Sequence, residues 1–174
     1  MKAEIEKVLS PLVGLDLIGI GRAADIESLT FGRHTASKRK DIELAPFVLH
    51  ICCAWRLLSR GSVFAGSADY DQPDSESTPH EEFEQRLVGS VLLDARHTEL
   101  REQLNETRYS VLGVQADNTG ALKVQLSGDL TIEIFPNASS AEGEEVEFWR
   151  FFQPGLDYSH FVVSTAGIDR ASDA

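Results

Sequence analysis

The sequence has no long hydrophobic run, and this absence excludes a helical membrane protein. In the 174 residues, no apolar run approaches the length of roughly 20 residues that a membrane-spanning helix needs. The N-terminal segment, MKAEIEKVLSPLVG, alternates charged and apolar side chains and therefore lacks the continuous apolar region of a secretory signal. We expect one domain, residues 1–174, in the cytoplasm and without membrane binding.

Cysteine is scarce, which argues against a disulfide framework or a zinc site. Cys52 and Cys53 are the two cysteines, and no CxxC or Cys/His metal spacing occurs. Neighbouring residues of a strand point to opposite faces, so we expect two small buried apolar residues in a reducing compartment. His50 would share a strand face with Cys52, which leaves a Cys–His dyad open against the more usual hydrogen-bonded core histidine. We expect no metal and no other cofactor.

Basic residues are also few. The chain has 16 Lys and Arg against 28 Asp and Glu, a formal net charge of −12. Such a surface repels phosphate backbones, so we expect no nucleic-acid binding. The same charge favours solubility and would attract a basic protein partner.

A glycine motif, Gly19-x-Gly21-x-x-Ala24, has the spacing of a dinucleotide-binding fingerprint. That fingerprint requires a helix directly after the glycines, because the pyrophosphate sits at the helix N-terminus. Here the residues that follow, DIESLTFG, alternate apolar and polar side chains up to Gly32, which is typical of a half-buried strand. We therefore interpret the motif as the first strand and turn of a β-hairpin.

A second region resembles the first. LIGIGRAADIESLTFG and VLGVQADNTGALKVQLSG each pass from an apolar strand through Ala-Asp into a second strand that ends on glycine. Each is followed by another apolar strand and by an aromatic run that contains Trp-Arg. This pattern favours an internal repeat of residues 15–67 and 109–164; chance resemblance between two ordinary hairpins is the alternative.

These patterns predict an α+β fold with a largely antiparallel sheet, built from two related β-meanders joined by a central helical segment. A short helix is expected over 2–10, and the central segment over 77–88 and 94–104. In the second piece, His97 has Asp94 and Arg101 about one turn away on either side, which indicates surface pairing. We expect a frayed tail after residue 168. Strands are expected over 15–23, 26–32, 47–58, 62–66, 109–116, 121–127, 130–135, 146–152 and 160–164.

Two sets of residues are candidates for function. The segment EFWRFF has apolar side chains on both faces, so one face requires a helix, a ligand or a partner beyond the core. A protein-binding surface would use this segment with the acidic loops, namely Asp69, Tyr70, Asp71, Glu144, Glu145, Trp149 and Arg150. A small-molecule-binding domain, or an enzyme, would instead line a pocket between the two meanders with His50, Trp55 and His160. A homodimer that buries the aromatic strand against its own copy is a third interpretation.

The C-terminal segments LTIEIFPNASS, EFWRFF and HFVVSTAGI carry a family resemblance. They resemble a loose group of small acidic bacterial proteins, often actinobacterial, over about the last 65 residues. The resemblance implies the strand pattern and brings no activity, catalytic residue or cofactor with it. Some small acidic proteins of this kind look like immunity proteins, which neutralise a partner toxin. We therefore expect a non-enzymatic protein-binding module, with the small-molecule-binding domain or enzyme as the alternative.

Overall fold

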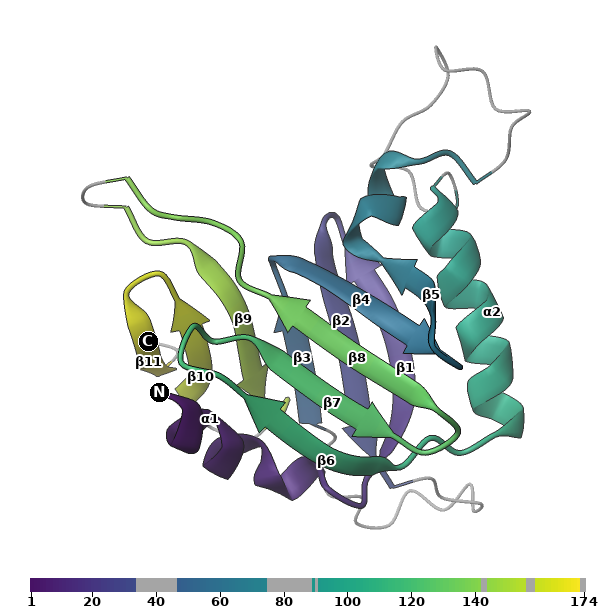
Figure 1. Cartoon of the computed structure of the whole chain (residues 1–174), viewed down its shortest axis with the longest axis horizontal. Helices are drawn as coiled ribbons and strands as arrows, with labels where there is room; N and C mark the ends of the chain where they lie inside the picture. The colour runs from purple at the N-terminus through teal and green to yellow at the C-terminus, as the bar shows by residue number, and fades with distance from the viewer. Residues whose placement is uncertain (34–46, 75–88, 90, 142–143, 156–158, 173–174) are drawn as a thin grey trace.

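Two antiparallel sheets build the fold, and each half of the chain contributes strands to both (Figure 1). The computed structural model describes residues 1–33, 47–74, 89, 91–141, 144–155 and 159–172. The α+β fold with antiparallel sheet is confirmed. Within the described residues, sheet one has the order β1 (Asp16–Ala23), β2 (Ile26–Gly32), β3 (Phe47–Ile51), β9 (Glu147–Phe152), β10 (Ser159–Ser164) and β11 (Gly167–Ser172). Sheet two has the order β5 (Ser62–Gly66), β4 (Ala54–Ser59), β8 (Leu130–Phe135), β7 (Leu122–Leu126) and β6 (Val111–Ala116).

The core lies between the sheets because the strands bury every second side chain. In β2 the buried positions include Leu29 and Phe31, and in β8 they include Ile132 and Ile134. Side chains two residues apart share one face of a strand, so each strand turns one apolar row inward. The inward rows of both sheets form one hydrophobic cluster that includes both tryptophans.

The expected long strand over 47–58 is wrong, because the chain changes sheets in the middle of it. β3 ends at Ile51 in sheet one and β4 begins at Ala54 in sheet two, with Cys52 and Cys53 at the corner between them. Cys52 is exposed and Cys53 is half-buried, so the expectation that both are buried is also wrong. The apolar run continues through this corner, because the strands before and after it both bury side chains in the core. The sequence pattern therefore does not show where one strand ends and the next begins.

The first half of the chain, which contains β1 to β5, and the second half, which contains β6 to β11, follow the same path in opposite sheets. β1, β2 and β3 lie side by side in sheet one before β4 and β5 cross to sheet two, whereas β6, β7 and β8 lie in sheet two before β9 and β10 cross to sheet one. A bridge between Asp16 and Ser110 joins the starts of β1 and β6. On either side of it, the backbone N–H groups of Leu17 and Val111 donate to the opposite half at 3.0 and 2.8 Å. The pairing between the halves is therefore symmetric about this bridge.

The strand register identifies which residues correspond. Trp55 lies opposite Ile134, and Trp149 lies opposite Ile51, so the two tryptophans hold matching positions. β1 and β6 each have an irregularity directly before a glycine, Gly19 or Gly113. The predicted repeat units contain these corresponding strands; their origin by duplication stays a prediction.

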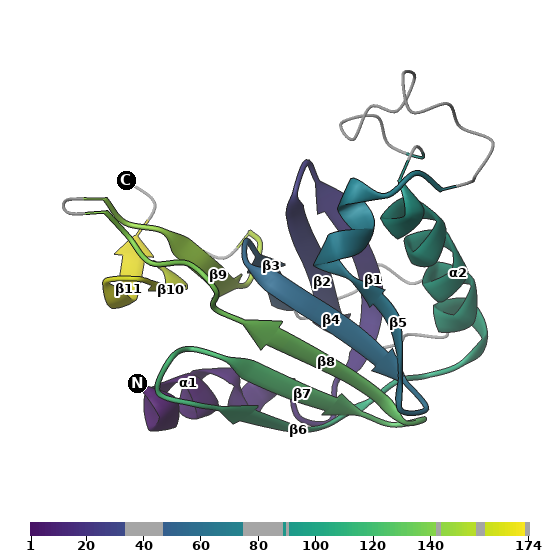
Figure 2. The ribbon, with the colours of Figure 1, turned by 45° about the horizontal axis from the view of Figure 1, so that its top comes forward.

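Two α-helices of the described residues cover the strands, and each packs against the other half of the chain (Figure 2). α1 (Lys2–Leu9) buries Ile5 and Leu9 and contacts β6; the 3-10 helix η1 (Ser10–Leu12) continues it through Pro11. α2 (Leu92–Glu106) contacts β1 and another 3-10 helix, η2 (Ser67–Asp71). The predicted helical piece over 77–88 lies outside the described residues.

The C-terminal tail is part of sheet one, contrary to the expected frayed end. β11 pairs with β10 through a turn at 164–167, and the pairing extends to Ser159 and Ser172. The polar composition of DRAS concealed this edge strand, which is held by backbone hydrogen bonds. No helix within the described residues is long and apolar enough to cross a membrane.

Candidate functional site

A group of charged side chains lies between the β1–β2 hairpin and α2. Arg22 of β1 stands directly opposite Glu27 of β2, near the tip of the hairpin. Asp94 and His97 approach from the first two turns of α2, one helical turn apart. We call Arg22, Glu27, Asp94 and His97 the ionic cluster.

Arg22 and Asp94 form a two-pronged ion pair. Arg22 Nε donates to Asp94 Oδ1 at 2.7 Å and Nη2 donates to Oδ2 at 2.8 Å, and their side chains are 3% and 11% exposed. The Gly89 N–H also donates to Asp94 Oδ2, at 2.6 Å. Burial acts to raise the pKa of Asp94, but the hydrogen bonds from Arg22 and Gly89 outweigh it and hold the pKa below its ordinary value. The Tyr70 ring, 5.0 Å from the Arg22 guanidinium carbon, contributes a cation–π contact.

Glu27 and His97 form a second, deeper pair. Glu27 Oε2 lies 3.1 Å from His97 Nε2, and the two side chains are 1% and 2% exposed. Glu27 Oε1 has no hydrogen-bond partner within the described residues. Burial raises the pKa of Glu27, and the hydrogen bond and charge of His97 offset only part of this shift. Folding therefore favours the protonated carboxyl, and ionisation of Glu27 as the pH rises through its raised pKa costs stability.

Arg101 lies across the backbone of β1 beside this pair. Its Nε donates to the Ile20 carbonyl at 2.9 Å. A Cβ at Gly21 would come within 3.2 Å of Arg101 Nη2, so the second glycine of the Gly-x-Gly motif provides the space for the guanidinium. The motif thus has a packing role within a hairpin.

A cavity of about 370 Å³ opens over the ionic cluster. This volume lies within the range of small-molecule pockets. Polar and charged side chains line much of it, including Arg22, Asp74, Asp94, His97, Thr98 and Arg101. The cavity is formed by β1 of the first half and α2, which leads into the second half, together with the chain around Asp74.

The second half of the chain shows that the fold does not require this cluster. By register, Arg22 and Glu27 correspond to Ala116 and Leu122, which face each other at the end of the β6–β7 hairpin. Ala116 and Leu122 are 8% and 3% exposed, so an apolar pair fills the matching position. Burial of an incompletely hydrogen-bonded carboxyl group is costly where an apolar residue would serve, which favours a functional reason for Glu27.

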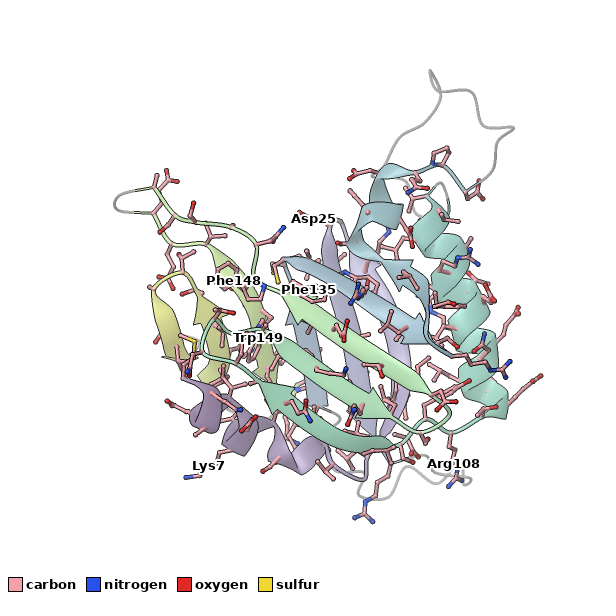
Figure 3. All side chains as sticks on the ribbon, in the orientation of Figure 1. Lys7, Asp25, Arg108, Phe135, Phe148 and Trp149 are labelled. Atoms are coloured by element: carbon pink, nitrogen blue, oxygen red, sulfur yellow. The ribbon has the colours of Figure 1, made fainter. Side chains whose placement is uncertain are left out.

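The predicted acidic loop borders this site. Asp69, Tyr70 and Asp71 lie in η2, which contacts α2, and Tyr70 stacks on Arg22. Asp69 Oδ2 accepts a hydrogen bond from the Gly66 N–H at 2.9 Å, so this carboxylate holds the start of η2. Asp25 lies at the tip of the β1–β2 hairpin, at the same end of the molecule as η2 (Figure 3).

The other predicted binding residues do not join this end. Glu144 and Glu145 precede β9, on the opposite side of the molecule from η2 in both ribbon views. The expectation that Trp149 belongs to a binding surface is wrong: its side chain is fully buried, and its Nε1 donates to the Gly120 carbonyl at 2.8 Å (Figure 3). Arg150 lies on the outer face of the same strand and pairs with Glu147, with a 2.6 Å bond from Nε to Oε1.

His50, Trp55 and His160 do not share a pocket between the two halves, which corrects that expectation. His50 and His160 both contact the Phe152 ring, at centroid distances of 4.9 and 4.3 Å, on the outer face of sheet one. Trp55 belongs to the core cluster between the sheets instead. His160 Nδ1 lies 3.5 Å from Arg150 Nη1, so residues from the two predicted sets meet here.

Cys52 is unsuited to nucleophilic catalysis at neutral pH. Partial burial, and then the Glu147 carboxylate 3.9 Å from its sulfur, raise the pKa of the Cys52 thiol to about 11. The thiolate fraction at pH 7 is then about 100-fold below that of an ordinary thiol. The structure therefore argues against the Cys–His dyad.

We expect alkylation of Cys52 to be slow in the native protein. In a Cys53→Ala background, iodoacetamide at pH 7 should react at least about tenfold more slowly with the native chain than with the urea-unfolded chain, because the greater nucleophilicity of a basic thiolate offsets only part of its scarcity. Glu147→Gln should increase the native rate, and Glu144→Gln serves as the matched control. A native rate equal to the unfolded rate would contradict the raised pKa.

The ionic cluster was not predicted from the sequence, although two signals of it were present. Glu27 interrupts the inward row that Leu29 and Phe31 continue, and His97 occupies an apolar position of α2 between Leu93 and Leu100. The expected surface pairing of His97 with its helix neighbours is wrong, because His97 is buried and pairs with Glu27. In both elements, a polar residue on an otherwise apolar, buried face was the sequence signal for a buried polar contact.

Comparison with known proteins adds no relative to this description. No family model, no curated protein and no solved structure matches the chain.

Proposed function

We propose that the protein is a binding module that takes up a small polar molecule in the cavity between β1 and α2. The observation that carries the proposal is the buried Glu27 carboxyl, whose Oε1 has no partner within the described residues. Buried polar groups are almost always hydrogen-bonded, so this exception calls for a partner that the described residues do not supply. Leu122, at the corresponding position of the second half, supports the proposal, because an apolar side chain is buried at that position.

The arrangement of charges also supports a binding site. Glu27, with a raised pKa, pairs with His97, and His97 lines the cavity. Perturbed titratable groups beside a cavity are typical of functional sites. The proposed site lies between β1 and α2, with Arg22, His97 and Arg101 at the cavity and Glu27 paired with His97. It differs from the small-molecule alternative of the sequence analysis, which expected a pocket between the two meanders.

A basic protein partner is the second candidate. Asp25, Asp71 and Asp74 are exposed, and Asp25 and η2 lie at one end of the molecule (Figure 3). Together with the net charge of −12, these carboxylates would attract a positively charged surface. In this candidate function, Asp69, Tyr70 and Asp71 belong to the binding surface and Trp149 does not. An immunity-like role would be of this kind.

Native mass spectrometry of the full chain, purified gently from its own host, tests the proposal. We expect a bound small mass that is lost in Arg101→Ala and retained in Arg96→Ala, which removes an exposed arginine from the same helix. Glu27→Gln is a second variant, because it keeps the volume of the side chain and replaces the titratable carboxyl group with an amide.

Two other results would overturn the small-molecule proposal. A co-purifying basic protein that is lost in Asp71→Ala or Asp74→Ala would support the second candidate instead. A chain or homodimer with no added mass would contradict both candidates.

A further inference from the structure

We propose that the molecule bound in this cavity is a small zwitterion, with a carboxylate and an ammonium group, as in a free amino acid. This inference rests on the proposed function above. It follows from which charged groups at the cavity are already paired and which are not.

Most charges of the ionic cluster already have partners. Both oxygens of Asp94 accept hydrogen bonds from Arg22, and Arg22 Nη1 donates to the Ala24 carbonyl at 2.9 Å. His97 holds one oxygen of Glu27. Because these groups already pair with one another, the charges of a ligand must pair with other side chains.

Arg101 provides the available positive charge. Its single hydrogen bond within the described residues runs from Nε to the Ile20 carbonyl, which anchors the side chain, whereas Nη1 and Nη2 make no hydrogen bond there. A guanidinium held in this way can receive a carboxylate through two parallel hydrogen bonds. The glycine at 21 maintains this position, because a Cβ would press on Nη2; by register its counterpart in the second half is Gln115.

Asp74 provides the available negative charge. It lines the same cavity, is exposed, and makes no hydrogen bond or ion pair within the described residues. In particular, no nitrogen of Arg101 lies within 4.0 Å of its carboxylate, so the two side chains form no ion pair with each other. Thr98 Oγ1 donates to the Asp94 carbonyl at 3.0 Å and has lone pairs left to accept a hydrogen bond from an ammonium group.

Among the described residues, Arg101 and Asp74 are a cation and an anion at the same cavity without an ion-pair partner, and together they favour a ligand that carries both charges. A singly charged molecule would pair with one of these two side chains and leave the other without a partner, whereas a zwitterion can pair with both. A volume of about 370 Å³ accommodates a free amino acid with room for its side chain.

Thermal unfolding and titration calorimetry of the full chain test this inference. The probes are the twenty common amino acids, each as the free zwitterion, the N-acetyl form without an ammonium group, and the amide without a carboxylate. We expect at least one free amino acid to raise Tm with increasing concentration, and its two capped forms to bind about 10- to 100-fold more weakly.

Variants locate the binding. Arg101→Ala and Asp74→Ala should each weaken binding of the effective amino acid by about 10- to 100-fold, whereas Arg96→Ala should leave its binding unchanged. Arg101→Lys is the second variant for the cationic position, since it keeps the charge and loses the paired donors.

The outcomes separate this inference from the function on which it rests. If a capped form binds as tightly as the free amino acid, or if Arg101→Ala binds normally, the zwitterion inference is wrong. If no amino acid shifts Tm but a small mass dependent on Arg101 is present in native spectra, the inference fails and the binding function stands. If neither binding nor a bound mass is found, both fail.

Discussion

Asp94→Ala is expected to lower the free energy of unfolding by about 3–5 kcal/mol, because it leaves a buried guanidinium without its carboxylate. The Arg22 side chain is 3% exposed and loses hydrogen bonds of 2.7 and 2.8 Å, and the Gly89 N–H loses its acceptor. Urea unfolding followed by circular dichroism measures this loss. Arg96→Ala is the matched control, because its pair with Glu99 is 40% and 48% exposed and should contribute no more than about 1 kcal/mol.

A double variant and a pH series make this prediction specific to charge. Arg22→Met with Asp94→Leu should recover most of the lost stability, since apolar residues replace a buried ion pair at little cost. The folded pKa of Asp94 lies below its ordinary value of 3.8, so its stabilising contribution is present above that pH and is lost as the pH falls through the lowered value. The difference in the free energy of unfolding between wild type and Asp94→Asn should therefore become smaller in strong acid. An Asp94→Ala loss no larger than that of Arg96→Ala would contradict the buried pair.

Trp149→Ala is expected to lower the free energy of unfolding by a similar amount, about 3–5 kcal/mol, because it opens a large cavity in the core. Trp149 is fully buried in the cluster between the sheets. Trp149→Phe should cost about 1–3 kcal/mol, because the Gly120 carbonyl loses its indole donor at 2.8 Å. Guanidinium unfolding of both variants measures these losses.

Trp55→Phe is the matched control, since Trp55 holds the corresponding position of the first half. Its side chain is 5% exposed and its indole makes no hydrogen bond within the described residues. We expect a cost below about 1.5 kcal/mol there. Equal losses in the two Trp→Phe variants would show that the Gly120 hydrogen bond adds nothing. A Trp149→Ala variant of normal stability would restore the interpretation of Trp149 as a surface residue.

Strands β6, β7 and β8 were predictable from their local sequence. Alternating segments and the Asp117–Gly120 turn placed β6, β7 and β8 within two residues of their observed bounds. The turn is held by its own residues, since Asp117 Oδ1 accepts hydrogen bonds from the Thr119 and Ala121 N–H groups at 2.8 and 3.0 Å. Local hydrogen bonds of this kind are encoded by neighbouring residues, so a sequence pattern can reveal them.

The candidate site was not predictable in the same way. Glu27 and His97 are 70 residues apart, and Arg22 and Asp94 are 72 residues apart. Helical spacing around His97 indicated a pairing within α2, whereas the packing of α2 on β1 gave Asp94 and His97 partners on the hairpin. Nothing in a local pattern shows which distant element will cover a given face.

The sequence alone determined the local elements, the inward row of each strand, the excess negative charge and the matching Trp-Arg segments of the two halves. These properties depend on backbone periodicity and composition, which neighbouring residues set. The tertiary structure alone decided that the chain changes sheets at Cys52, that Trp149 is core, and that Glu27 is buried beneath α2. The physical reason is that burial depends on which surfaces meet, and the exchange of strands between the two halves brings together surfaces that are far apart along the chain.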